Sequence, residues 1–180
     1  MSYILGLDVS TSIIGYTIIN SDQAVIEIDH IDLRKLKDLW EKADYARNRL
    51  KDIIAKHDIT STYIEESLQV FRSGFSSAHT LSTLSKFNGL MFYFTREYTG
   101  FNPISVSASS ARKLCGIKIK KGTKAKIQAF EWVTQELQMT WPLTRHGNVQ
   151  QYCYDRSDSY VIARAGRALQ LKTINDEPIK

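Results

Sequence analysis

The run Tyr3-Ile4-Leu5-Gly6-Leu7-Asp8-Val9-Ser10-Thr11 begins as an apolar stretch and carries an acid close to its end. A short apolar run followed by polar turn residues predicts a buried β-strand over 3–9. Residues 13–19 and 25–29 form two further strand-like runs, and the connections among the three are short. Short connections favour antiparallel pairing, so we expect the chain to begin with a three-stranded meander.

The periodicity changes after residue 35, where apolar residues recur at helical spacing. Helices are predicted over 35–57, 77–98, 109–114, 123–139 and 155–171. Two more strands are predicted between them, over 62–66 and 103–106. The order βββαβαβαα predicts an α/β fold, with a five-stranded mixed sheet flanked by helices.

Length and composition narrow the class of protein. A chain of 180 residues fits one domain, so we expect residues 1–180 to form a single unit. A hydrophobic content of 43% excludes wholesale disorder. The sequence contains no run of 18 apolar residues, so no membrane span is predicted. The first residues lack the basic region of a signal peptide, and the two cysteines form no disulfide framework. We therefore expect a cytoplasmic protein.

The positive charge is concentrated in one segment. Residues 112–126 contain no acid, and the other parts of the chain hold fewer basic than acidic residues. A solvated surface is one interpretation of this segment; a phosphate-binding edge is the other, because clustered charge attracts a polyanion. The basic residues are Arg112, Lys113, Lys118, Lys120, Lys121, Lys124 and Lys126.

Four acids lie in apolar surroundings. Asp8 ends the first predicted strand and Glu65 ends the fourth, while Asp155 and Asp158 share one face at the start of the last helix. If the first and fourth strands are neighbours, these carboxylates meet, and they repel one another unless cations neutralise them. Oxygen ligands select Mg²⁺ or Mn²⁺, and two such ions suit phosphodiester hydrolysis.

Each acid also has an ordinary structural interpretation. A strand-end Asp can cap a turn, and acids at a helix start complement the helix dipole. Glu66 competes with Glu65 for the place beside Asp8. Strand alternation sends the two glutamates to opposite faces, so only one of them can join the group.

Three stretches together resemble the motifs of the RuvC-like Holliday junction resolvases, which have the RNase H-like fold. Residues 4–11, with Gly15-Tyr16 beyond, resemble the first motif. Tyr63-Ile64-Glu65 resembles the second acidic strand, and residues 155–163 resemble the closing Asp-x-x-Asp helix. Residues 107–126 resemble the basic segment of that family. The resemblance covers about residues 3–170.

This resemblance implies a homodimer that nicks branched DNA in pairs, with two Mg²⁺ or Mn²⁺ ions in each active site. The substrates would be four-way junctions, with forks and flaps as further candidates in a bacteriophage member acting in the bacterial cytoplasm. The implied metal ligands are Asp8, Glu65, Asp155 and Asp158. Either Lys124 or Lys126 would match the basic group near the scissile phosphate.

One departure concerns an aromatic residue. The family commonly has an aromatic almost directly after the second acid, used as a wedge at the junction, whereas five residues separate Glu65 from Phe71 here. We interpret Phe71 as that DNA-contacting aromatic, with a core position as the alternative.

Two other functions fit parts of the sequence. Asp8-Val9-Ser10-Thr11 with Gly15 also resembles the first phosphate loop of sugar-kinase and actin-type phosphotransferases, but those proteins need two such domains and commonly twice this length. A non-catalytic module that binds branched DNA would have no reason to keep four carboxylates together.

Overall fold

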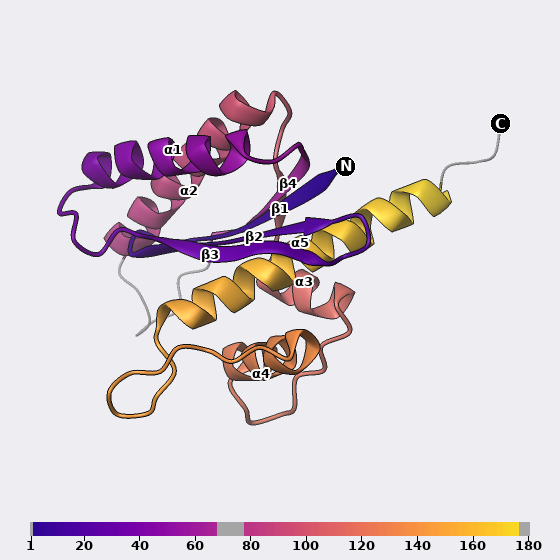
Figure 1. Ribbon diagram of the computed structural model, residues 1–180. Coiled ribbons are helices and arrows are strands. Elements are labelled where there is room, and N and C mark those ends of the chain that lie inside the picture. Colours follow the sequence, from indigo (N-terminus) through magenta and orange to yellow (C-terminus); the bar gives the residue numbers. More distant parts are fainter. Residues whose placement is uncertain (1, 68–77, 177–180) are drawn as a thin grey trace.

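A computed structural model describes residues 2–67 and 78–176, and its centre is a five-stranded sheet in the order β3-β2-β1-β4-β5 (Figure 1). The strands β1, β2 and β3 pair antiparallel, whereas β4 runs parallel to β1 and β5 runs parallel to β4. The predicted meander and mixed sheet are confirmed. The strands are β1 Tyr3–Val9, β2 Ile13–Asn20, β3 Val25–Asp32, β4 Ile59–Glu65 and β5 Ile104–Val106.

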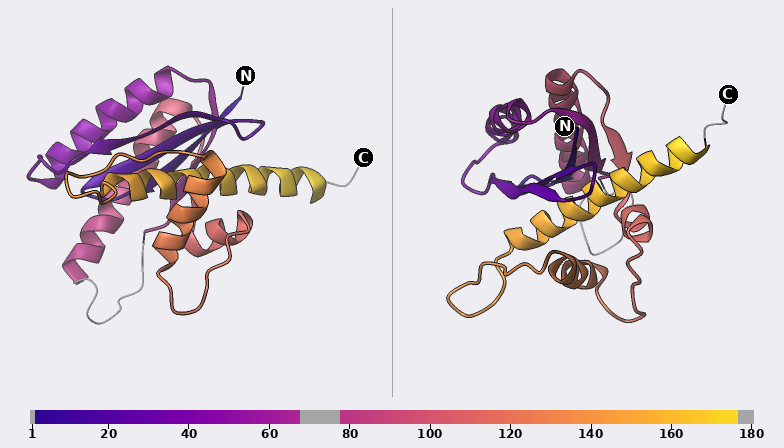
Figure 2. Two further views of the ribbon diagram at one scale, coloured as in Figure 1. Left: turned by 60° about the horizontal axis from the view of Figure 1, so that its bottom comes forward. Right: turned by 45° about the vertical axis from the view of Figure 1, so that its right-hand side comes forward.

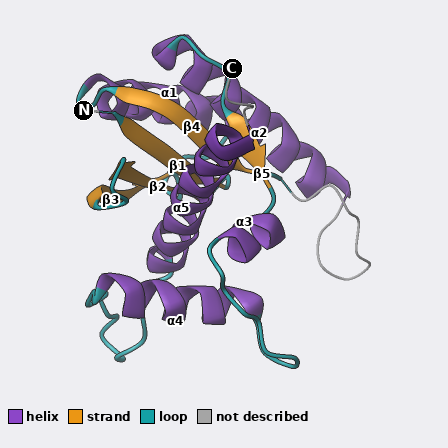
Figure 3. Ribbon diagram, turned by 90° about the vertical axis from the view of Figure 1, so that its right-hand side faces the viewer, coloured by secondary structure: helices purple, strands orange, loops and turns teal. Residues whose placement is uncertain are grey.

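Helices cover both faces of the sheet. Figures 1 and 2 show α1 and α2 on one face and the long α5 crossing the other. Figure 3 shows α3 and α4 on the far side of α5 from the sheet, and both helices contact α5. None of the helices in the described residues is long and apolar enough to cross a membrane. The helices are α1 Leu39–Ala55, α2 Ala78–Thr99, α3 Ala108–Leu114, α4 Ala125–Leu137 and α5 Tyr152–Asp176.

Strand alternation divides the core into two layers. Leu5 and Leu7 of β1 join the cluster under α1 and α2, whereas Ile4 joins the cluster under α5. On β4, Ile64 lies in the first cluster and Tyr63 in the second. The even-numbered residues of β1 therefore face α5, as do the odd-numbered residues of β4 from Ser61 onward, after a shift in the β1–β4 register. This parity decides which acids meet.

Several element boundaries differ from the prediction for local reasons. The helix α1 begins at Leu39 instead of residue 35, because the Asp38 side chain accepts hydrogen bonds from the backbone N–H groups of Trp40 and Glu41. The helix α4 ends at Leu137, since Gln138 adopts a left-handed conformation with φ of 48°. The helix α5 begins three residues earlier than predicted, so Asp155 lies inside its first turn.

Candidate active site

Two of the acids lie side by side at the ends of adjacent parallel strands. Leu7 of β1 pairs with Ile64 of β4, and the next residues along the two strands are Asp8 and Glu65. Both follow the parity that faces α5. The neighbouring Glu66 is exposed, and its backbone N–H donates to the Val106 carbonyl at 3.0 Å. Glu65 is thus the glutamate that the fold places beside Asp8.

The helix α5 brings the other two acids to this pair by pressing directly on the sheet. A Cβ atom on Gly15 would lie 2.0 Å from the Asp155 carbonyl oxygen, and one on Gly6 would lie 2.5 Å from the Ser159 carbonyl oxygen. Only glycine allows such an approach. A buried hydrogen bond of 2.8 Å between the hydroxyls of Thr17 and Ser159 also joins α5 to β2.

We expect Gly15→Ala to destabilise the protein, although the substitution adds only one methyl group. The added methyl group would collide with backbone, so the start of α5 has to move away from the sheet. Thermal unfolding should show a destabilisation of about 1–3 kcal/mol, the usual cost of overpacking. Gly89→Ala is the matched control, because a Cβ there meets nothing within 4 Å, and it should be neutral or slightly stabilising. Equal stability of the two variants would contradict the close approach at Gly15.

Burial raises the pKa of all four acids, and neighbouring carboxylates add to the shift for Asp8, Glu65 and Asp158. Burial, followed by the charges of Glu65, Asp158 and Asp155, holds the pKa of Asp8 well above its ordinary range. Burial and the nearby Asp158 raise the pKa of Glu65 to about 7. Burial also raises the pKa of Asp155 and of Asp158. Burial and the neighbouring charges therefore disfavour the state in which all four carboxyl groups are ionised.

The side chain of Lys126 reaches this group. The Lys126 ammonium lies 3.1 Å from Asp158 Oδ2 and 3.4 Å from Asp155 Oδ1, and its side chain is 46% exposed. Burial opposes the charge of Lys126, but Asp158, Asp8 and Asp155 outweigh it and raise its pKa. Arg112 lowers the pKa of Glu65 and of Asp158 by its charge, so it also lies near the site.

The other residues of the predicted basic segment lie on α3, in the loop after it and just before α4. Arg112 and Lys113 on α3 and Lys118 in the following loop border a cavity of about 390 Å³. Lys120 and Lys121 are exposed in the loop between α3 and α4. Lys124 is the exposed residue that precedes α4, so of the two lysines left open by the sequence, Lys126 is the one that lies among the carboxylates. Phe71 lies outside the described residues.

Two contributors were not predicted from the sequence. The Asn88 side chain, buried on α2, donates to the Glu65 carbonyl oxygen at 3.1 Å and so supports the end of β4. A polar residue within an apolar helix is the sequence signal that could have identified it. Arg156 and its partners Asp29 and His30 on β3 were also missed; a basic residue between two predicted metal ligands is a weaker signal.

The donor set has the chemistry that a hard divalent cation requires. It consists of carboxylate oxygens, and burial together with the charges of Glu65 and Asp158 raises the pKa of Asp8, a shift that a bound cation would oppose. Among residues 2–67 and 78–176, no three acid, histidine or cysteine side chains converge closely enough to hold one ion. The Lys126 ammonium instead lies between two of the acids. The residues fit a divalent ion in the chemistry of their donor atoms, and binding one would require their side chains to turn toward it.

Known proteins resemble this chain in structure, although not in sequence. No protein-family model and no curated protein matches the sequence. The RuvC protein of T. thermophilus in complex with a Holliday junction substrate aligns with 96% of this chain and 98% of its own, at a TM-score of 0.69 and 12% identity. The yeast mitochondrial Holliday junction resolvase Ydc2 aligns with 96% of this chain and 80% of its own, at a TM-score of 0.60 and 16% identity.

The chain therefore has the RNase H-like α/β fold in the form found in Holliday junction resolvases. The resemblance read from the three sequence motifs is confirmed at the level of the fold. At 12–16% sequence identity, these matches establish the fold alone.

Proposed function

We propose that the protein is a metal-dependent endonuclease that cleaves four-way and related branched DNA by paired nicking. The observation that carries this proposal is the group of four carboxylates at the ends of β1 and β4 and the start of α5, with raised pKa values in a fold shared with resolvases. A fold does not by itself define a function, so the site chemistry is the main support.

Asp8, Glu65, Asp155 and Asp158 would hold Mg²⁺ or Mn²⁺, two ions in each site. Such ions supply a water nucleophile at neutral pH and neutralise the charge on the departing oxygen. The protein side chains orient the scissile phosphate. The half-exposed Lys126 ammonium lies where a phosphate entering the site would meet it, and it can transfer its hydrogen bonds from the carboxylates to that phosphate.

Cleavage of labelled DNA tests the proposal. Four-way, three-way, flap and linear duplexes are incubated with the protein in Mg²⁺ and in EDTA. We expect cleavage of the branched substrates in Mg²⁺ only, with the linear duplex left intact. Cleavage in EDTA would exclude the metal site, and equal cleavage of linear duplex would exclude the preference for branched DNA.

The basic segment is proposed to bind the phosphate backbone. Replacing Lys118, Lys120 and Lys121 together with Ala should weaken binding of all DNA shapes about equally, because phosphate contacts carry no base information. The slope of log K against log salt should fall by about 0.9 for each duplex phosphate that the variant no longer neutralises. Lys51→Ala on α1, combined with Lys56→Ala at the C-cap of that helix, lies across the sheet; this control should leave the slope unchanged. An unchanged slope in the triple variant would show that these lysines form a solvated surface and do not bind phosphate.

We further propose a homodimer, because paired nicks on a two-fold symmetric junction require two active sites. The helix α2 is the proposed interface, since it leaves Tyr93 57% exposed while Leu90 and Phe92 are half-buried. Sedimentation at micromolar concentration should give about twice the chain mass of 20.6 kDa. A monomer, both free and bound to DNA, would contradict paired cleavage and leave a single-nicking enzyme.

A further inference from the structure

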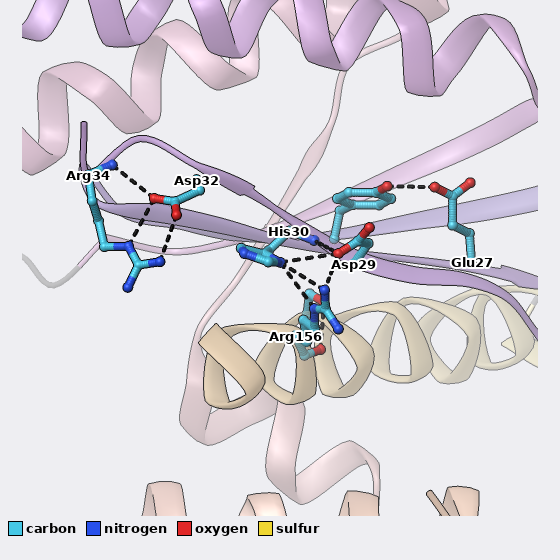
Figure 4. A network of polar contacts seen from close by, with 8 residues as sticks. Glu27, Asp29, His30, Asp32, Arg34 and Arg156 are labelled. Carbon is cyan, nitrogen blue, oxygen red and sulfur yellow. Dashed lines mark hydrogen bonds and ion pairs between the residues drawn. The ribbon is translucent and has the colours of Figure 1, made fainter. Parts of the chain in front are cut away.

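Arg156 lies between the two acids of α5, and its side chain reaches the outer strand of the meander (Figure 4). Its Nη2 donates to Asp29 Oδ1, and its Nε lies 3.2 Å from His30 Nδ1. The same Asp29 oxygen accepts a hydrogen bond of 2.8 Å from the His30 backbone N–H, which holds the carboxylate toward the guanidinium. The ion pair with Asp29 and the contact with His30 thus join the start of α5 to two adjacent residues of β3.

Aromatic contacts hold this connection in place. Tyr152, one turn before Arg156 on α5, stacks on His30 with ring centroids 4.2 Å apart and planes at 3°. The guanidinium carbon of Arg156 lies 4.8 Å from the centroid of the Tyr152 ring. The Arg156 and His30 side chains are only 16% and 15% exposed, so packing restricts the guanidinium, whereas the Asp29 carboxylate is 46% exposed and the ion pair stays open to solvent on that side.

The position of Arg156 on the helix gives this connection a mechanical consequence. Successive residues of an α-helix are turned by about 100°, so Asp155 and Asp158 share a face while Arg156 points to one side of it. A rotation of α5 by about 10° would move atoms about 6 Å from its axis by about 1 Å. Displacements of this size in a catalytic group cost about 10²-fold in rate.

We propose that Arg156 is a positioning residue, which fixes the rotation of α5 through Asp29 and His30 and so keeps Asp155 and Asp158 on the side of the helix that faces Asp8 and Glu65, from which they would bind a divalent ion. This inference rests on the proposed metal-dependent function. Partners that orient metal ligands typically change metal affinity or activity by about 10–100-fold when they are removed.

The rest of α5 is held to the sheet independently of Arg156. The Thr17–Ser159 hydrogen bond and the close approach at Gly6 do not involve the Arg156 side chain. At the other end of the helix, Arg167 Nε donates to the Ser21 carbonyl oxygen at 2.9 Å. Arg167 therefore offers a matched control, since it is also an arginine that joins α5 to the meander but lies three turns away from the acids.

The experiment measures Mn²⁺ affinity of the DNA-free full chain by electron paramagnetic resonance, and four-way junction cleavage as a function of Mg²⁺ concentration. Arg156→Met should weaken Mn²⁺ binding about 10–100-fold and raise the Mg²⁺ concentration for half-maximal rate by a similar factor. Arg156→Lys should recover part of the loss, because it keeps the charge opposite Asp29. Asp29→Asn should act in the same direction as Arg156→Met and add little to it in the double variant.

Arg167→Met should lower thermal stability without changing Mn²⁺ affinity. Wild-type Mn²⁺ affinity in Arg156→Met, or equal losses in Arg156→Met and Arg167→Met, would overturn the positioning role. If Arg156→Met does not fold, Asp29→Asn carries the test, and wild-type affinity there overturns the role equally. If the wild type and Arg156→Met both bind Mn²⁺ and cleave equally well, only this inference is excluded. If the wild type neither binds Mn²⁺ nor cleaves, the proposed function is excluded.

Discussion

Asp8→Asn is expected to abolish cleavage of four-way junctions while junction binding survives. The charges of Glu65, Asp158 and Asp155 all act on Asp8, so Asp8 would bind ions together with ligands from β4 and α5. Asparagine keeps the shape but removes the charge that a hard cation selects. Binding should be unchanged or tighter, because a negative charge leaves a site for a polyanion. Gel shifts and single-turnover cleavage measure the two effects separately.

Asp158→Asn should behave in the same way, and a glutamate pair supplies the internal control. Glu65→Gln should greatly reduce cleavage, whereas Glu66→Gln should be mild because Glu66 is exposed beside the site. Nicking at the wild-type rate by Asp8→Asn or Asp158→Asn would refute the assignment of these ligands. A larger loss of cleavage in Glu66→Gln than in Glu65→Gln would show that the wrong face of the strand had been assigned to the site.

The second large effect concerns stability without metal. The pKa of Glu65 is raised from an ordinary value of 4.5 to about 7 in the folded protein. A carboxyl group whose pKa is raised on folding adds to the free energy of unfolding. This contribution is complete below pH 4.5 and is lost as the pH rises through 7. In EDTA, the free energy of unfolding of the wild type relative to Glu65→Gln should therefore fall by roughly 2–3 kcal/mol between pH 4.5 and pH 8.

Magnesium should reverse this loss in the wild type at pH 8, because an ion that binds only the folded state stabilises it. It should stabilise Glu65→Gln less. Glu66→Gln should follow the wild-type curve, since it lies outside the carboxylate group. Urea unfolding at several pH values measures the difference, and parallel curves for the wild type and Glu65→Gln would contradict the raised pKa of Glu65.

The arrangement of the sheet was predictable because its signals are local. Period-2 apolar runs and short turns fix the meander, and strand parity places Asp8 and Glu65 on one face. The spacing of Asp155 and Asp158 places both on one side of a helix. A glycine inside a strand indicates a close backbone approach, and the structure places the Asp155 carbonyl oxygen against Gly15.

Other features depend on how distant segments pack, and local patterns do not contain them. The choice between Lys124 and Lys126 depends on where α4 begins, and Lys124 makes no side-chain capping bond that would mark that boundary. The hydrogen bond of Arg156 with Asp29 joins residues 127 positions apart. Nothing in either local sequence indicates this pairing, because it exists only once α5 lies across β3.

Cleavage of a supercoiled plasmid that extrudes a cruciform tests the central claim most directly. The protein is added with Mg²⁺, and nicked and linear products are followed over time. Two symmetric sites acting within one binding event should produce linear plasmid without accumulation of nicked circle, and EDTA or Asp8→Asn should produce neither. Accumulation of nicked circle before any linear product, or cleavage that persists in EDTA, would contradict a metal-dependent enzyme that resolves junctions by paired nicking.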